Sequence, residues 1–132
     1  DEAVAVDGVL IAGREDISMN RFTDRKRQDM SYVLKGHNLD LPVILMDHQP
    51  FNIDDSVNWN IDLHLSGHTH NGQLWPLNYI TDMIYDISFG YGTVENTQVY
   101  VSCGYGTWGP PVRTSGRPEL VVFQIRFRQQ GH

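Results

Sequence analysis

The sequence contains a single cysteine, Cys103, among 132 residues, so no disulfide can form within it. It also lacks a signal peptide and any apolar run of about eighteen residues, so we expect this stretch of chain to be soluble. Basic residues are scarce, with 10 lysines and arginines against 16 aspartates and glutamates and a formal net charge of −6. This negative net charge argues against a protein that binds nucleic-acid phosphates. It leaves phosphate chemistry open, because a bound metal ion supplies local positive charge.

The composition that remains is typical of one globular domain over residues 1–132, with 40% hydrophobic and 20% charged residues. Residues 3–6 and 8–13 predict a hairpin around Asp7-Gly8. A helix is predicted from a Thr23 cap to about Lys35, and its buried stripe would be Met30, Val33 and Leu34. The sequence has no internal repeat and no linker that would divide it.

The rest of the chain is rich in strand-like runs. They lie at residues 43–46, 61–66, 87–91, 98–103 and 120–127, and the last of these alternates cleanly. Between them we expect an irregular stretch or short helix at 51–60, an apolar loop at 75–80 and a long Gly- and Pro-rich loop at 104–113. This order predicts an α/β, β-rich fold with a mixed sheet.

Three histidines follow the ends of predicted strands. His48 comes just after the run 43–46, and His68 and His70 come just after the run 61–65. Imidazole is the commonest metal ligand among side chains, and ligands bind at this end of the strands in open α/β sheets. Alone, each histidine reads as a polar residue that closes a strand, but together they predict a metal site. Gly67 would let the backbone turn sharply between them.

The other histidines are not candidates for the metal site. His64 lies within a strand and is interpreted as structural or surface-exposed, while His37 and His132 are interpreted as solvated. Trp75 and Trp108 are loop aromatics that would either line a substrate or lipid-facing groove or, as we expect, pack over the core. The run 25–27 (Arg-Lys-Arg) is interpreted as a solvated helix face.

Four motifs together carry a family resemblance: Asp-His-Gln-Pro at 47–50, Asp-Leu-His-Leu-Ser-Gly-His-Thr-His-Asn-Gly-Gln at 62–73, Val-Ser-Cys-Gly-Tyr-Gly-Thr-Trp-Gly-Pro-Pro-Val-Arg at 101–113, and Arg-Pro-Glu-Leu at 117–120. With them, the chain resembles the C-terminal half of a calcineurin-like metallophosphoesterase. The run after Val101 is similar to a bacterial branch of predicted phosphohydrolases, often membrane-anchored, which includes enzymes that cleave UDP-2,3-diacylglucosamine. The resemblance covers most of residues 1–127.

The resemblance implies a four-layer α/β/β/α sandwich and a two-metal phosphohydrolase that cleaves phosphoester or pyrophosphate bonds with a metal-activated water. His48 and His68 would bind one ion, His70 would bind the other, and the ions would be Mn, Fe or Zn. The substrate would be a phosphorylated small molecule or a lipid-nucleotide. Asn71 and Cys103 stand where glycine and arginine are common in this branch, and we expect neither change to affect metal binding.

The N-terminal motifs of the family are missing. Upstream of Asp62 the sequence has no Asp-x-His, and nowhere does it have a Gly-Asp-x-x-Asp or a Gly-Asn-His, so it carries only part of the expected ligand set. Together with the start at Asp1, this predicts a fragment that lacks the N-terminal metal-ligand half and is inactive alone, and its parent would be soluble or membrane-anchored. Two alternatives stay open: a non-catalytic metal-binding or interaction domain that uses the same histidines, and a purely structural β-rich domain.

Two further expectations concern binding. Arg113 follows the Gly- and Pro-rich loop and would hold substrate phosphate oxygens, or else would form a salt bridge or be solvated. Loss of the N-terminal half would uncover apolar residues on strands 43–46, 61–65 and 121–127, so we expect a homodimer through this uncovered sheet face.

Overall fold

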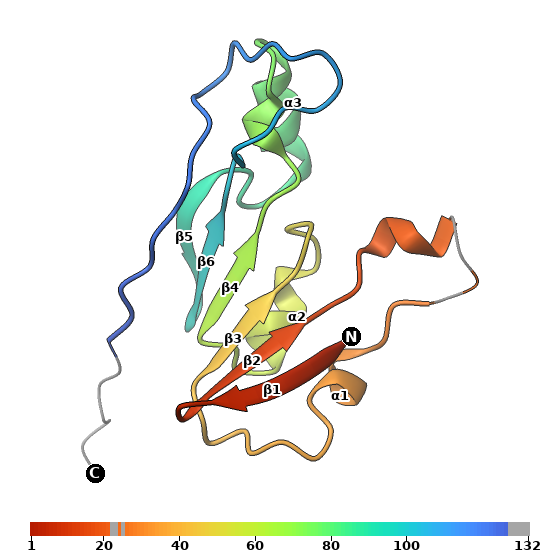
Figure 1. The fold of residues 1–132 in the computed structure, drawn as a ribbon, viewed down its shortest axis with the longest axis vertical. Coiled ribbons are helices and arrows are strands. Elements are labelled where there is room, and N and C mark those ends of the chain that lie inside the picture. Colours follow the sequence, from red (N-terminus) through yellow and green to blue (C-terminus); the bar gives the residue numbers. More distant parts are fainter. Residues whose placement is uncertain (22–23, 25, 127–132) are drawn as a thin grey trace.

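A computed structural model describes residues 1–21, 24 and 26–126. Its strands form one sheet of six in the order β1-β2-β3-β4-β6-β5 (Figure 1). Neighbours β2, β3, β4 and β6 run parallel, and β1 and β5 pair antiparallel at the two edges. The strands are β1 (Glu2–Val6), β2 (Val9–Gly13), β3 (Val43–Met46), β4 (Leu63–Ser66), β5 (Gly90–Val94) and β6 (Thr97–Val101). The expected α/β, β-rich class with a mixed sheet is therefore confirmed, and the described residues supply one sheet.

The helices are short. They are the 3-10 helices η1 (Ile17–Arg21) and η2 (His70–Gly72) and the α-helices α1 (Met30–Val33), α2 (Ile53–Asn58) and α3 (Leu77–Ile84). The helix α3 replaces part of the apolar loop expected at 75–80, so that prediction was wrong. Within the described residues, no helix is long and apolar enough to cross a membrane.

The predicted helix from 23 to 35 is reduced to α1, and its Thr23 cap lies outside the described residues. Residues 26–29 are not helical because they are held elsewhere: the Gln28 amide donates to the Asp1 carboxylate, and the Arg27 side chain pairs with Asp47. The predicted buried stripe is confirmed, since Met30, Val33 and Leu34 are all buried.

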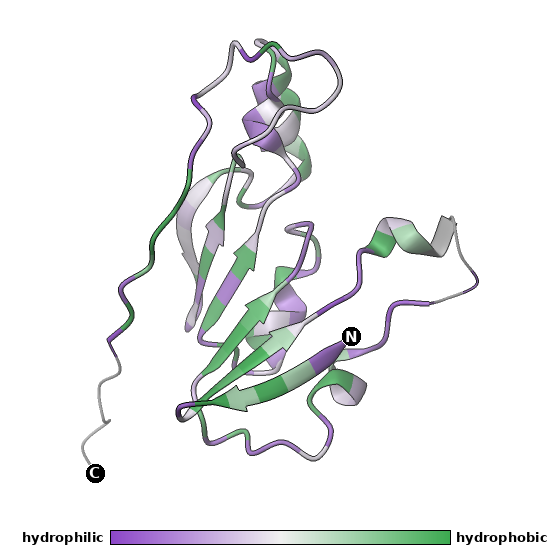
Figure 2. Cartoon of the chain, in the orientation of Figure 1, coloured by the Kyte–Doolittle hydropathy of each residue, from purple (hydrophilic) through white to green (hydrophobic). Residues whose placement is uncertain are grey.

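One face of the sheet carries the core. Side chains alternate along each strand, so Leu10, Val43 and Leu45 pack against α1, while Val99 and Val101 pack with Ile53 of α2. The alternate side chains of each strand lie on the opposite face of the sheet. We call it the open face, and it is formed by Val4, Val6, Ile11, Ile44, Met46, Leu63, Leu65, Tyr91 and Tyr100. Figure 2 shows that β2 and β3 are largely hydrophobic along their length, whereas β5 is mostly pale.

The C-terminal strand predicted at 120–127 is not a strand in its described part. Residues 120–126 run extended but join no ladder, and Phe127 lies outside the described residues. Because β6 already lies between β4 and β5, the segment cannot pair with β6. The segment instead lies over the open face, where Phe123 packs edge-on against Tyr100 with ring centroids 5.2 Å apart. A cavity of about 640 Å³ lies between the segment and the sheet.

Candidate functional site

The candidate site begins where β3 and β4 end. The backbone ladder continues past both strands, because the Asp47 amide donates to the Leu65 carbonyl at 3.0 Å and the Gly67 amide donates to the His48 carbonyl at 3.1 Å. Since parallel neighbours end at the same edge of a sheet, this ladder brings His48 and His68 together.

The two imidazoles are in direct contact. His48 Nε2 and His68 Nδ1 lie 2.9 Å apart, and the rings meet at 75°. His70 touches neither ring but lines the same cavity of about 500 Å³. The three predicted histidines thus gather at one edge of the sheet. No three His, Cys, Asp or Glu side chains in the described part of the chain are placed so as to surround one ion.

A run of left-handed backbone aims these rings. His68, His70, Asn71 and Gln73 all have positive φ, between 49° and 66°, which residues with a side chain seldom adopt. Such strain gathers at functional sites. We expected Gly67 to make the sharp turn, and this was wrong, because Gly67 has no positive φ and the histidines themselves carry the turn.

Gly72 is the glycine that the turn requires. It has φ of +68°, and a Cβ there would lie 2.2 Å from the Asn78 backbone nitrogen at the start of α3. The close approach of η2 and α3 therefore depends on Gly72, and α3 forms one wall of the cavity through Leu77, Ile80 and Thr81.

The electrostatics favour neutral rings. Burial lowers the pKa of His68, and repulsion from His48 lowers it further, against an opposing effect of Asp16. Burial also lowers the pKa of His70, with repulsion from Arg113 as the next cause. Neutral imidazole is the form that offers a lone pair to a metal ion, so both rings are in the protonation state that a ligand needs at neutral pH.

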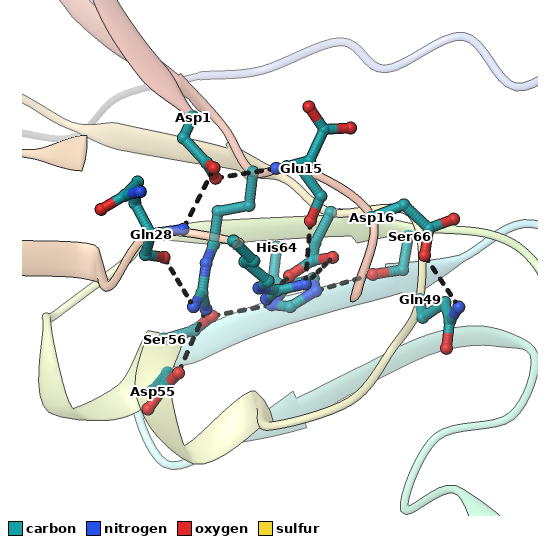
Figure 3. A network of polar contacts seen from close by, with 12 residues as sticks. Asp1, Glu15, Asp16, Gln28, Gln49, Asp55, Ser56, His64 and Ser66 are labelled. Atoms are coloured by element: carbon teal, nitrogen blue, oxygen red, sulfur yellow. Dashed lines mark hydrogen bonds and ion pairs between the residues drawn. The ribbon is translucent and has the colours of Figure 1, made fainter. Parts of the chain in front are cut away.

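Asp16 lies in the same cavity, and the sequence analysis missed it. Its Oδ2 atom lies 3.5 Å from His48 Nε2, while Oδ1 accepts a hydrogen bond from the Ser18 amide. Oδ1 also accepts from Gln49 Nε2 (Figure 3). Burial alone would raise its pKa, but the hydrogen bonds from Ser18 and the charges of His48 and His68 outweigh burial and lower it. The available signal was position, since Asp16 closely follows β2, the parallel neighbour of β3.

Arg113 lies beside His70, with Nη2 at 3.5 Å from His70 Nδ1. The same Nη2 donates to the carbonyls of Cys103 at 3.0 Å and Gly106 at 2.5 Å. Among the described residues it has no carboxylate partner, and its buried Nε and Nη1 have no hydrogen-bond partner. The salt-bridge and solvated alternatives for Arg113 therefore do not describe it.

The loop 104–113 is held by hydrogen bonds at its middle and at its base. The buried Gln73 side chain donates to the Trp108 carbonyl at 2.6 Å and accepts from the Trp108 amide at 2.5 Å. At the base, the Glu119 carboxylate accepts from Ser102 Oγ and from the Cys103 amide. Trp108 is nevertheless 73% exposed and Trp75 is 68% exposed, so the expectation that they pack over the core was wrong.

A buried polar network lies beneath the site (Figure 3). His64 is 1% exposed and is bonded on both ring nitrogens, to Ser56 Oγ at 2.7 Å and Ser66 Oγ at 2.6 Å. Its structural interpretation is confirmed, and burial lowers its pKa. Arg27 was expected to be solvated, but its guanidinium is buried and forms a two-pronged pair with Asp47, the residue before His48.

Sequence comparison relates the chain to named proteins. It is 34% identical over 136 residues to an uncharacterized metallophosphoesterase of Helicobacter pylori, covering 98% of this chain and 35% of the relative. It is 35% identical over 128 residues to an uncharacterized metallophosphoesterase of Aquifex aeolicus, covering 95% and 49%. It is 37% identical over 119 residues to a Bos taurus protein named transmembrane protein with metallophosphoesterase domain, covering 86% and 27%. No family model matches, and no solved structure matches significantly.

The chain spans between 27% and 49% of the length of these relatives. The relatives come from animals as well as bacteria, so the bacterial branch expected from the sequence is not confirmed. Over nearly the whole chain, about one third of the residues are identical to those of proteins that share the name metallophosphoesterase.

Proposed function

We propose that this chain supplies part of the active site of a metal-dependent phosphohydrolase, in which His48, His68 and His70 bind metal ions. One observation carries the proposal: His48 Nε2 and His68 Nδ1 lie 2.9 Å apart. Two nitrogens bound at right angles to one ion, each with a bond of about 2.1 Å, lie about 3 Å from one another. The two rings therefore need little movement to share an ion.

The proposed ligand set is incomplete within this chain. His48 and His68 would hold one ion and His70 the other, and the remaining ligands would come from the rest of a parent polypeptide. Manganese, iron and zinc all suit imidazole ligands. Such an ion polarises a phosphoryl oxygen and lowers the pKa of a bound water. The chain's own contribution is to hold His68 and His70 neutral and aimed into one cavity.

Arg113 is proposed to bind substrate phosphate. Its buried Nε and Nη1 lack hydrogen-bond partners in the described part of the chain, and a buried N–H without an acceptor is costly. Phosphate oxygens are strong acceptors for guanidinium N–H groups and would satisfy them. The loop that carries Arg113 would have to open slightly, and its fastening through Gln73 limits that movement.

Two substrate classes remain in the proposal: a phosphorylated small molecule and a lipid-nucleotide with a pyrophosphate bond, such as UDP-2,3-diacylglucosamine. The cavity wall supports an amphiphilic substrate, because Leu77, Ile80 and Trp108 line it together with the histidines. In Figure 1, α3 lies at the end of the sheet where β4 ends, next to the loop that follows β6. A membrane-anchored parent is a related proposal, supported by the name of the bovine relative.

The test separates metal binding from hydrolysis. Co²⁺ titration of this chain, followed by visible absorption, should show binding that H68A abolishes and that H37A retains, because His37 does not line the cavity. The chain alone should not hydrolyse bis(p-nitrophenyl) phosphate with Mn²⁺, whereas the full-length parent should do so in a manner that depends on His68. Equal Co²⁺ binding by H68A and wild type would overturn the proposal.

The second candidate is a non-catalytic metal-binding or interaction domain. It is favoured by the lack of any three-residue metal group among the described residues. A full-length parent that binds Co²⁺ through His68 but hydrolyses neither a generic phosphodiester nor a nucleotide pyrophosphate would select this candidate.

A further inference from the structure

Asp16 is a carboxylate at the candidate metal site that no motif of the chain identifies. It follows β2, which is the parallel neighbour of β3, and the ladder continues past both strands through the Arg14 amide and the Met46 carbonyl at 3.0 Å. Three successive parallel strands, β2, β3 and β4, therefore deliver Asp16, His48 and His68 to one edge of the sheet. All three line the same cavity.

The two oxygens of Asp16 have different surroundings. Oδ1 accepts two hydrogen bonds, at 2.7 Å from the Ser18 amide and at 3.0 Å from Gln49 Nε2. These bonds fix the plane of the carboxylate. Oδ2 faces the imidazole of His48, with 3.5 Å to Nε2, the same nitrogen that contacts His68 Nδ1. One oxygen thus anchors the side chain while the other points toward the nitrogens that would bind an ion.

A paired histidine site for a divalent cation gains from a nearby negative charge. Two neutral imidazoles donate lone pairs but leave the charge of the ion uncompensated, and carboxylates that accompany metal-binding histidines typically change metal affinity by about 10–100-fold. Within the described ranges, Asp16 is the one acidic residue that forms an ion pair with any of the three histidines. Arg27 pairs with the nearby acid Asp47, whereas Asp16 has no lysine or arginine partner among the described residues.

We propose that Asp16 belongs to the metal site as its acidic residue, placed by Ser18 and Gln49 so that Oδ2 faces the ion bound by His48 and His68. This inference rests on the proposed function, because it requires that these two histidines bind an ion. The competing interpretation is local: Asp16 only caps the turn into η1 through Ser18 and ties it to Gln49. That role needs a hydrogen-bond acceptor but no charge.

The substitution D16N separates the two roles, because an amide oxygen can still accept from Ser18 and Gln49 while the charge is lost. Co²⁺ binding to the chain, followed by visible absorption, should weaken about 10–100-fold in D16N. The matched control D40N removes an exposed carboxylate elsewhere and should bind as wild type does. D16E restores the charge and should recover part of the affinity, and the urea midpoints of D16N and wild type should agree.

The outcomes are distinguishable. If H68A abolishes Co²⁺ binding and D16N binds as tightly as D40N, the inference about Asp16 is wrong and the proposed function stands. If H68A binds as wild type does, or the wild-type chain binds no Co²⁺, both fail. A loss of affinity in D16N that D16E does not recover would also count against a role for charge.

Discussion

The buried pair of Arg27 and Asp47 allows a quantitative prediction. Both side chains are almost inaccessible, at 6% and 1% exposed, and they meet through two bonds, of which Nη1–Oδ1 is 2.9 Å. The substitution R27M keeps much of the apolar stem but leaves the Asp47 carboxylate buried without its cation. Removing one partner of such a pair typically costs about 3–5 kcal/mol. That is a large share of the roughly 5–15 kcal/mol that stabilises a folded domain.

Urea unfolding followed by tryptophan fluorescence measures this cost. With a urea m-value of about 2 kcal/mol/M, a loss of about 3 kcal/mol lowers the midpoint by about 1.5 M. The adjacent K26M is the matched control, because Lys26 is exposed and its loss should change stability by less than about 0.5 kcal/mol. The double variant R27M/D47L should be more stable than R27M, since no charge then stays buried alone. If R27M and K26M unfold within about 1 kcal/mol of one another, the pair does not stabilise the fold as argued.

Three further predictions concern pH, the loop and association. Burial lowers the pKa of His64 from 6.5, so below pH 6.5 the unfolded chain binds a proton that the folded chain does not bind. The free energy of unfolding of the metal-free chain should therefore fall on acidification, by on the order of 1 kcal/mol per pH unit. The urea midpoint of H64N should fall less steeply than that of wild type between pH 7.5 and 5.5. In Q73A the two side-chain bonds to Trp108 are lost, so hydrogen exchange at the Trp108 amide should quicken at least about tenfold, and unchanged exchange would show that other contacts hold the loop. We propose that the open face mediates a homodimer; light scattering over a dilution series should then show dissociation, M46K should be monomeric, and a wild-type chain that stays monomeric at high concentration would exclude this association.

The parts of the sheet that depend on short stretches of sequence could be predicted. The hairpin at Asp7-Gly8 is confirmed because both residues have the positive φ that such a turn requires. The strands before His48 and His68 are confirmed because continuous apolar runs mark buried parallel strands. The segment 120–127 alternates just as clearly, yet its described part pairs with no strand, because the pattern of a segment cannot reveal whether it finds a partner strand.

The site was predictable only in part. The histidines were found because they follow strands, but Asp16 is separated from His48 by 32 positions and meets it only through the order of strands in the sheet. Arg27 looked solvated because it stands in a basic run, and only the tertiary fold brings the Asp47 carboxylate to it. The exposure of Trp75 and Trp108 was also missed, because the sequence of a loop does not indicate whether an aromatic side chain faces the core or the solvent.

The hydrogen bonds that continue beyond β3 and β4 have a consequence for how the chain tolerates insertions. The spacing of His48 and His68 is set by the ladder between β3 and β4, which two backbone bonds from the Asp47 and Gly67 amides extend beyond the strands. Residues added beside the exposed Asn60, outside this ladder, should therefore leave the two rings in place. A single residue inserted between Leu65 and Gly67 would shift the ladder and reverse the face on which every later side chain lies. The length of the connection between β3 and β4 is free to vary over evolution, whereas the number of residues at the end of β4 is not.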